Sequence, residues 1–169
     1  VTGVQTCALP IYTHAEVTCQ LLEAGIPVYL EKPLAITMDS ATKVLTTAYE
    51  TGTRLYVGHN MRHMNVVRSM RDLIRSGRIG EVKAIWCRHF VGSGGDFYFK
   101  DWHATREHGT GLLLQKAAHD IDVMHWFADS HTTDVVGMGG LTLYDRITDR
   151  RDNSDQLMEI GRASCRERV

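Results

Sequence analysis

The sequence predicts an α/β fold, and two observations support this prediction. Between residues 13 and 60, stretches with helical spacing of apolar side chains alternate with short apolar stretches typical of buried strands. The connections between them are only a few residues long, which is typical of parallel strands joined by crossover helices. In such folds the carboxyl ends of the strands face the crevice where ligands bind. The alternation ends near Asn60, where we place a domain boundary.

The first part of the chain contains two predicted helix and strand pairs. Residues 13–24 have apolar side chains at helical spacing and are followed by Gly25, which predicts a helix with Thr13 as its N-cap. Residues 26–30 (IPVYL) predict a short strand. The second pair is a helix over 39–50, capped by Thr37 or Asp39 and ended by Gly52, and a strand over 54–60.

The second part begins with a helix over 64–77 that Gly77 terminates. A long strand is predicted over 81–90 and a last strand over 134–144. Residues 91–108 are rich in glycine and aromatic residues and predict a functional loop. Residues 109–128 predict a helix that the chain enters through glycines.

Composition excludes several classes of partner. The 169 residues are 43% hydrophobic and 23% charged, with a formal net charge of −1, which is typical of a globular protein. Basic residues form no stripe, and no apolar run is long enough to span a membrane, so we expect neither nucleic acid nor membrane as a partner. The expected location is the cytoplasm, since the start lacks the order of a signal peptide.

Both ends of the chain are expected to be foreign to the protein. Residues 1–11 (VTGVQTCALPI) and 159–169 (EIGRASCRERV) can each be back-translated into a sequencing adapter read in frame. We leave them out of the fold prediction, as for any such scar. What lies between is then expected to be a fragment of an open reading frame, with residues 12–60 and 61–158 as parts of two domains.

A charged turn follows the first predicted strand, at Glu31-Lys32-Pro33. A carboxylate there can accept two ribose hydroxyls, and an ammonium can donate to a substrate oxygen on which negative charge develops. Proline fixes the backbone, so both side chains are aimed before a ligand arrives. The alternative is a solvated surface turn, which three residues alone do not exclude.

A second polar group interrupts the apolar stripes of the helix over 109–128. Gln115 lies four residues and Lys116 three residues before His119, so all three can share a helix face. A neighbouring ammonium would lower the pKa of His119 and keep it as a neutral base, while Asp122 could orient the ring. The alternative is a packed histidine with both nitrogens satisfied.

No metal site is predicted. The cysteines form no close pair, and the histidine spacings fit neither HExxH nor a compact zinc pattern. The histidines considered are His103, His108, His119 and His125.

Three ordered stretches resemble the Gfo/Idh/MocA oxidoreductases, the group of glucose-fructose oxidoreductase and inositol dehydrogenase. They are YTHAEVTCQLLEAGIPVYLEKPLAIT (12–37), VGHNMRHMNVVRSMRDLIRSGRIGEV (57–82) and GTGLLLQKAAHDIDVMHWF (109–127). The resemblance implies the carboxyl-terminal part of a Rossmann domain for NAD or NADP, then part of an α+β domain with an open, mainly antiparallel sheet. It also implies hydride transfer between nicotinamide and a hydroxyl-bearing carbon of a sugar, cyclitol or related polyol, in a parent protein expected to be a homo-oligomer.

The resemblance also implies roles for individual residues. The family often has an aspartate where this chain has Gln115, which cannot act as an acid or base, so Lys116 is expected to assist in its place. The expected catalytic residues are Lys32, His119 and Lys116. The expected cofactor contacts are Glu31, Lys32, Pro33, Thr13 and His14, and the expected substrate contacts are Arg62, Gln115 and Asp122.

Two alternatives stay open at this point. One is a catalytically silent nucleotide-binding or regulatory protein of the same fold, which the loss of the aspartate at Gln115 favours. The other is a glycosidase that uses NAD in a redox-assisted cycle. The starting glycine motif of a Rossmann domain is missing from the sequence, so the chain by itself is expected to bind dinucleotide poorly and to be inactive.

Overall fold

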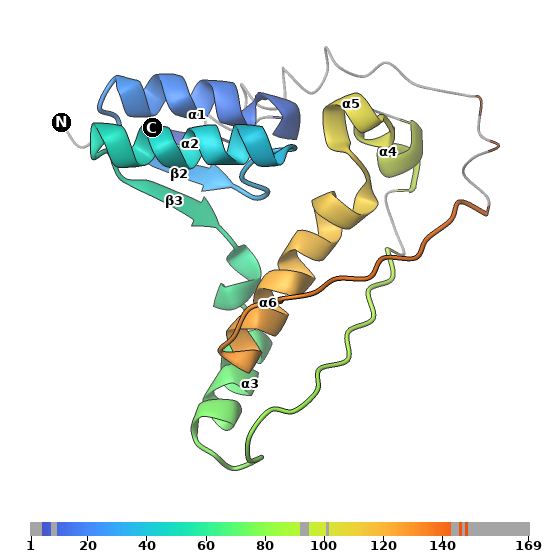
Figure 1. Ribbon diagram of the computed structural model, residues 1–169. Coiled ribbons are helices and arrows are strands. Elements are labelled where there is room, and N and C mark those ends of the chain that lie inside the picture. The colour runs from blue at the N-terminus through green and yellow to red at the C-terminus, as the bar shows by residue number, and fades with distance from the viewer. Residues whose placement is uncertain are drawn as a thin grey trace.

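The computed structural model describes residues 5–7, 10–91, 95–100, 102–142, 146 and 148. Within these ranges a small parallel sheet with two covering helices precedes a second, mostly helical part (Figure 1). None of the helices in the described part of the chain has both the length and the apolar character that a membrane crossing requires.

The sheet contains three parallel strands in the order β1-β2-β3, with bounds Gln5–Cys7, Val28–Glu31 and Leu55–Gly58. Register pairs Val28 with Leu55 and Glu31 with Gly58, so β2 and β3 end at the same edge. The strand β1 lies in the segment 1–11 that the sequence prediction left out, and it pairs with β2 as an edge strand. The adapter origin of that segment stays a prediction.

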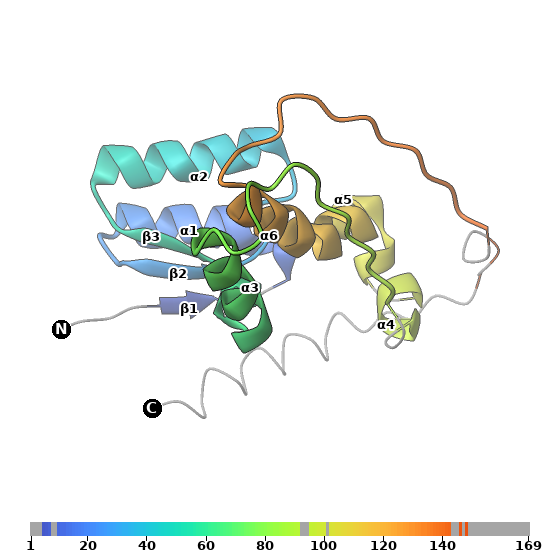
Figure 2. The same ribbon diagram turned by 90° about the horizontal axis from the view of Figure 1, so that it is seen from below.

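Helices α1 (His14–Glu23) and α2 (Met38–Thr51) lie side by side over one face of the sheet (Figures 1 and 2). Their apolar stripes meet the inward side chains of β2, where burial alternates from one residue to the next. The resulting core consists of Cys19, Leu22, Val28, Leu30 and Val44. This core fixes where β2 ends, and therefore where the charged turn begins.

Local signals set the helix boundaries here. Thr37 caps α2, because its hydroxyl accepts a hydrogen bond from the backbone N–H of Ser40 at 3.1 Å. Gly52 ends the helix with a φ of 63°, a conformation that glycine adopts without a steric penalty. The predicted helices of this part and both predicted strands are therefore confirmed, and of the two possible caps Thr37 is the one used.

The second part packs two helices against each other. After β3, the chain passes through η2 (Asn60–His63) into α3 (Asn65–Arg75), which packs on α6 (Ala118–Ala128). Val67 of α3 and Val123 and Phe127 of α6 form a second, smaller core. The α6 helix continues from five residues of π-helix, η4 (Leu113–Ala117). Together they cover residues 113–128 of the helix that was expected over 109–128.

Three expectations for the second part differ from the structure. The segments 81–90 and 134–144 were expected to be strands, yet 81–90 and 134–142 have no partner strand in the described part of the chain, and residues 143 and 144 lie outside it. A strand is stable only when a neighbour takes up its backbone hydrogen bonds, which the residue pattern alone does not supply. The expected loop 91–108 contains short helices instead: α4 (Gly95–Lys100), η3 (Trp102–Ala104) and α5 (Arg106–Gly109).

Candidate active site

A buried histidine, His14, holds the charged turn after β2 through a hydrogen bond to its backbone. The His14 side chain is 1% exposed, and its Nδ1 lies 2.8 Å from the carbonyl oxygen of Pro33. Since a carbonyl can only accept, Nδ1 of His14 carries the proton and donates it. His14 thus fixes the turn, and Thr13 is engaged at the start of α1 through its hydroxyl, which donates to Pro10 O at 2.8 Å.

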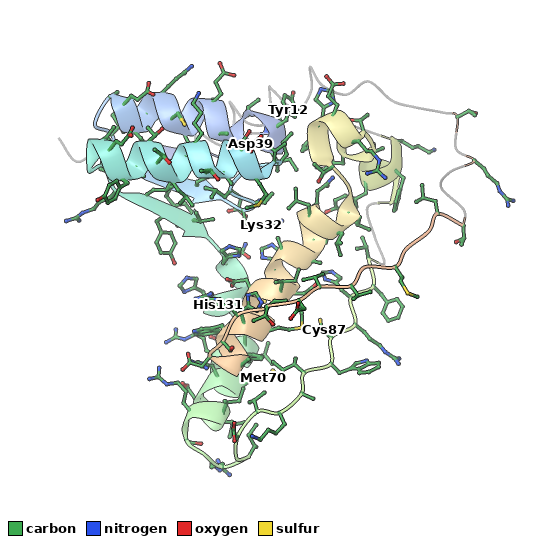
Figure 3. The ribbon with its side chains drawn as sticks, viewed as in Figure 1. Tyr12, Lys32, Asp39, Met70, Cys87 and His131 are labelled. Carbon is green, nitrogen blue, oxygen red and sulfur yellow. The ribbon has the colours of Figure 1, made fainter. Side chains whose placement is uncertain are left out.

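Lys32 reaches from this turn across to the helix of the second part. Its Nζ donates a 2.6 Å hydrogen bond to the backbone carbonyl of Gln115, which joins residues 83 positions apart. Figure 3 shows Lys32 at this junction between the sheet and the helix formed by η4 and α6. Partial burial and repulsion from Lys116 lower the pKa of Lys32, and Glu31 opposes this by raising it. Lys32 therefore holds its proton less tightly than a solvated lysine does.

Gln115, in the π-helical turn η4, has one set of partners for its side chain and another for its main chain. Its side chain is buried, and Nε2 donates to the carbonyls of His103 at 3.0 Å and Gly109 at 3.4 Å. The main chain of Gln115, not its side chain, thus meets Lys32. Helices with an inserted π turn often occur at functional sites, because the wider turn redirects side chains and frees carbonyl groups. The expected contact between the Gln115 side chain and substrate stays a prediction.

His119 lies at the start of α6 and is held in its neutral form. Burial, followed by Lys32, His59 and Lys116, lowers its pKa to about 4, and only Asp120 opposes this. Its Nδ1 is buried and has no hydrogen-bond partner within the part of the chain that the structure describes. A neutral imidazole with one nitrogen still to be satisfied can accept a proton from a bound molecule.

A second histidine shares this environment. Burial and the charges of Lys116 and Lys32 lower the pKa of His103 to about 4. The ring of His103 stacks on Trp102 with 3.5 Å between centroids, and the ammonium of Lys116 lies 4.6 Å from the Tyr98 ring centroid. The helices found between residues 95 and 109 therefore bring His103 and an aromatic support for Lys116 to the site.

Arg62 of η2 and Asp122 of α6 form an ion pair with two hydrogen bonds. Arg62 donates from Nε to Oδ2 and from Nη2 to Oδ1 of Asp122, both at 2.7 Å. These bonds and the charge of Asp122 raise the pKa of Arg62. His59 Nδ1 is 3.7 Å from Asp122 Oδ2, which is too long for a hydrogen bond, and its ring meets that of His119 edge-on with centroids 6.4 Å apart.

The structure therefore brings together most of the residues singled out from the sequence. Lys32, Lys116 and His119 share one electrostatic environment, and Arg62 with Asp122 adjoins it through His59. Glu31 is partly exposed at the end of β2, next to Lys32. The hydrogen bond between His14 and the carbonyl of Pro33 holds the backbone of this turn in place.

Sequence reasoning did not assign His59 or His103 to the site. A signal for His59 was present, because it directly follows β3, and the carboxyl ends of neighbouring parallel strands share one edge. No comparable signal exists for His103, since its position depends on how residues 95–109 fold back onto η4.

Two of the grooves lined by described residues of the second part bear on the site. One, of about 420 Å³, has Lys116, Asp120, Cys87 and His89 in its lining, so it reaches the side of η4 that carries Lys116. The other, of about 720 Å³, lies between segments 82–85 and 130–136 beside α6, and contains none of Lys32, Lys116 and His119. No group of three or more metal-ligating side chains occurs among the described residues.

The donor set fits a nicotinamide dinucleotide. A partly exposed carboxylate, Glu31, stands at the carboxyl edge of a parallel sheet, where such cofactors place their ribose. Lys32 follows Glu31 directly, and its ammonium suits a substrate hydroxyl, as does Nδ1 of His119, which has no hydrogen-bond partner among the described residues.

Comparison with known protein families shows to which family the chain belongs. Residues 4–59 match the model described as the oxidoreductase family, NAD-binding Rossmann fold, and residues 67–161 match the GFO/IDH/MocA C-terminal domain. The chain belongs to the GFO/IDH/MocA oxidoreductase family. The family resemblance and the fold class expected from the sequence are therefore confirmed, and the cofactor of this fold is a nicotinamide dinucleotide, NAD or NADP.

Individual relatives of this GFO/IDH/MocA chain include sugar and cyclitol oxidoreductases. The 1,5-anhydro-D-fructose reductase of Ensifer adhaerens is 32% identical over 126 residues, which are 74% of this chain and 37% of that protein. The inositol 2-dehydrogenase of Azotobacter vinelandii is 32% identical over 120 residues, 70% of this chain and 33% of that protein. The chain thus spans about a third of the length of the curated relatives it matches.

Solved structures of the GFO/IDH/MocA family share the fold. The oxidoreductase domain protein from Kribbella flavida has a TM-score of 0.63 at 26% identity, over 76% of this chain and 36% of that one. An inositol dehydrogenase homolog from Azotobacter vinelandii, solved in complex with NAD⁺, has a TM-score of 0.63 at 20% identity, over 75% and 34% of the two chains.

Proposed function

We propose that this chain is part of an NAD(P)-dependent oxidoreductase that acts on a hydroxyl-bearing carbon of a sugar, cyclitol or related polyol. The activity is proposed for the complete protein that carries this sequence, because the chain corresponds to about a third of its curated relatives. A homo-oligomer in the cytoplasm, with a Rossmann part over 12–60 and a substrate-binding part over 61–158, belongs to the same proposal.

One observation carries the proposal. A histidine with its pKa lowered to about 4 and a lysine with a lowered pKa lie together at the carboxyl edge of a parallel sheet. Oxidation of an alcohol needs a base for the hydroxyl proton and a donor that stabilises the oxygen as it becomes a carbonyl. His119 supplies the base, and Lys32 supplies the donor.

The bound dinucleotide supplies the hydride acceptor for oxidation and the hydride donor for reduction. Glu31 accepts hydroxyl groups of its ribose, while Pro33, Thr13 and His14 shape the turn and the start of α1 beside it. On the substrate side, Arg62 and Asp122 form one wall of the site, and Gln115 presents the carbonyl that orients Lys32. Burial and Lys32 lower the pKa of His119 most, and Lys116 adds to this effect and assists in catalysis.

The test uses the complete protein and measures NADH or NADPH formation against a panel of sugars and cyclitols. We expect His119→Asn to lower kcat by about 10²- to 10⁴-fold, the usual contribution of one general base. Lys32→Met should lower kcat to a similar degree, because the developing oxyanion loses its donor. The control is His131→Asn, which changes an exposed histidine outside the site and should leave kcat unchanged.

Other results would assign the site differently. Dinucleotide binding without turnover, unaffected by either variant, would indicate the silent nucleotide-binding protein that the buried Gln115 amide is compatible with. Glycoside cleavage without net cofactor reduction would indicate the redox-assisted glycosidase. Failure of the complete protein to bind NAD and NADP would contradict both enzymatic functions.

A further inference from the structure

One indole, that of Trp126 on α6, contacts the guanidinium groups of two arginines. The Cζ atom of Arg62 lies 5.4 Å from the ring centroid of Trp126, and the Cζ atom of Arg71 lies 5.5 Å from it. Both distances are within the roughly 6 Å over which an aromatic face attracts a cation, and tryptophan gives the strongest attraction of this kind. Arg62 belongs to η2 and Arg71 to α3, so the indole joins both elements to α6.

The core between α3 and α6 holds both the indole and Arg71. Trp126 packs against the buried side chains of this core, which are Val67, Val123 and Phe127. Arg71 is 8% exposed and donates to the carbonyl of Phe127 at 3.4 Å and to Oδ1 of Asp129 at 3.2 Å. The position of the indole is therefore set by this core and not by Arg62.

Arg62 is less restrained than Arg71. Its side chain is 40% exposed, and it donates two hydrogen bonds of 2.7 Å to Asp122. An exposed arginine loses rotamer entropy when it is held in one geometry, and solvent screens its attraction to a carboxylate, so such a pair is weak by itself. Contact with a fixed indole limits the conformations that Arg62 samples, so less entropy is lost when it meets Asp122.

The position of Arg62 matters because Asp122 has a second donor nearby. Nδ1 of His59 lies 3.7 Å from Oδ2 of Asp122, and it is buried without a hydrogen-bond partner among the described residues. While Arg62 occupies both oxygens, His59 does not bond to Asp122. If Arg62 moved away, Asp122 would turn to His59, because a buried donor and a largely buried carboxylate are both costly to leave unpaired. The ring of His59 meets that of His119 edge-on, so this exchange would alter the surroundings of the proposed base.

We propose that Trp126 is a positioning residue, which holds the guanidinium of Arg62 on Asp122 and thereby keeps Asp122 from bonding to His59. Core packing accounts for Trp126 only in part, because an aliphatic side chain would also fill the core but would not attract a guanidinium. The effect of Trp126 on catalysis rests on the proposed function. Its effect on Arg62 does not, so the two can be tested separately.

The first experiment measures the hydrogen exchange of the Nε–H group of Arg62 by NMR, in the complete protein made with isotope-labelled arginine. The signal of Arg62 is assigned by its loss in Arg62→Lys. We expect Trp126→Leu to speed this exchange by about two- to thirtyfold, the effect of losing one cation–π contact. Trp126→Phe should retain part of the protection, because phenylalanine also offers an aromatic face to the guanidinium.

Two controls separate this effect from a general loss of packing. Val67→Ala removes volume from the same core but keeps the indole, and Trp86→Leu makes the same change at an exposed tryptophan. Both should leave the exchange at Arg62 unchanged, because neither removes the aromatic contact of its guanidinium.

The second experiment measures kcat/KM of the complete protein with a substrate from the panel of sugars and cyclitols. Trp126→Leu and Arg62→Met should each lower kcat/KM. The double variant should lose about as much as Arg62→Met alone, because Trp126 acts through Arg62. A role of Trp126 in core packing alone would make the two losses of transition-state stabilisation add.

The outcomes separate this inference from the proposed function. Exchange at Arg62 that is unchanged in Trp126→Leu, or equally faster in either control, would overturn the positioning role, and so would additive losses of kcat/KM. Faster exchange in Trp126→Leu alone, in a protein that turns over no sugar or cyclitol, would support the positioning of Arg62 and contradict the proposed catalysis.

Discussion

At the scale of single residues, the pair Arg62 and Asp122 connects the end of the sheet to α6. Asp122 is only 13% exposed, and both of its oxygens are used by Arg62 at 2.7 Å. Removing one partner would leave a largely buried carboxylate or a guanidinium without its acceptor. We expect Asp122→Asn to lower the free energy of unfolding by about 1–3 kcal/mol, measured by denaturant titration of the complete protein.

A double-mutant cycle distinguishes the pair from other effects of the same substitutions. Arg62→Met and Asp122→Asn combined should cost less than the sum of the two single changes, by about 1 kcal/mol or more. Arg62 is itself 40% exposed, which limits the coupling that solvent screening allows. Strictly additive effects would show that the ion pair contributes no stability and that the wall it forms is held by other contacts.

At the scale of secondary structure, the π-helical turn η4 is supported by a glycine of α5. A Cβ placed on Gly109 would collide with Nε2 of Gln115 and would lie 3.1 Å from the carbonyl oxygen of His103. Gly109→Ala should therefore displace the Gln115 side chain and lower the free energy of unfolding by about 1–3 kcal/mol, the usual cost of overpacking. The displacement should also lower kcat, because the carbonyl that orients Lys32 belongs to Gln115.

The matched control is Gly137→Ala, since a Cβ at Gly137 would meet nothing within 4 Å. Its stability should stay within about 0.5 kcal/mol of the unmodified protein. Adding Gln115→Ala to Gly109→Ala removes the atoms that collide and should recover part of the lost kcat. If Gly109→Ala leaves both stability and kcat unchanged, η4 does not depend on this close approach.

Helix ends could be predicted from the sequence better than strands. The N-cap at Thr37 and the stop at Gly52 act within one turn of the helix, so local chemistry decides them. The segments 81–90 and 134–142 have a strand-like pattern, but a strand also needs a partner, which is a long-range property. The π turn at η4 depends on contacts of Gln115 with residues 103 and 109, and no local signal in the sequence indicates it.

At the scale of the whole molecule, the sequence could indicate individual site residues but not the contacts that bring the two parts of the chain together. Lys32 could be placed because it follows a predicted parallel strand, and His119 and Lys116 because they share a helix. The hydrogen bond from Lys32 to the carbonyl of Gln115 joins residues 83 positions apart in the sequence, so only the structure could show it. The same holds for His103, which reaches the site through the packing of η3 and α5.

Two partly buried histidines make the stability of the whole molecule depend on pH. His103 and His119 have a pKa lowered to about 4, against 6.5 in the unfolded chain. Between these values the unfolded chain binds protons that the folded protein does not, so stability falls as the pH is lowered from 6.5 towards 4.

We expect the denaturant midpoint of the complete protein to decrease across this window, with net proton uptake on unfolding. His119→Asn should make the decrease shallower, whereas the same change at exposed His131 should not. A slope unchanged in His119→Asn would show that the pKa of His119 is not lowered in the folded state, which would contradict the observation that carries the proposed function.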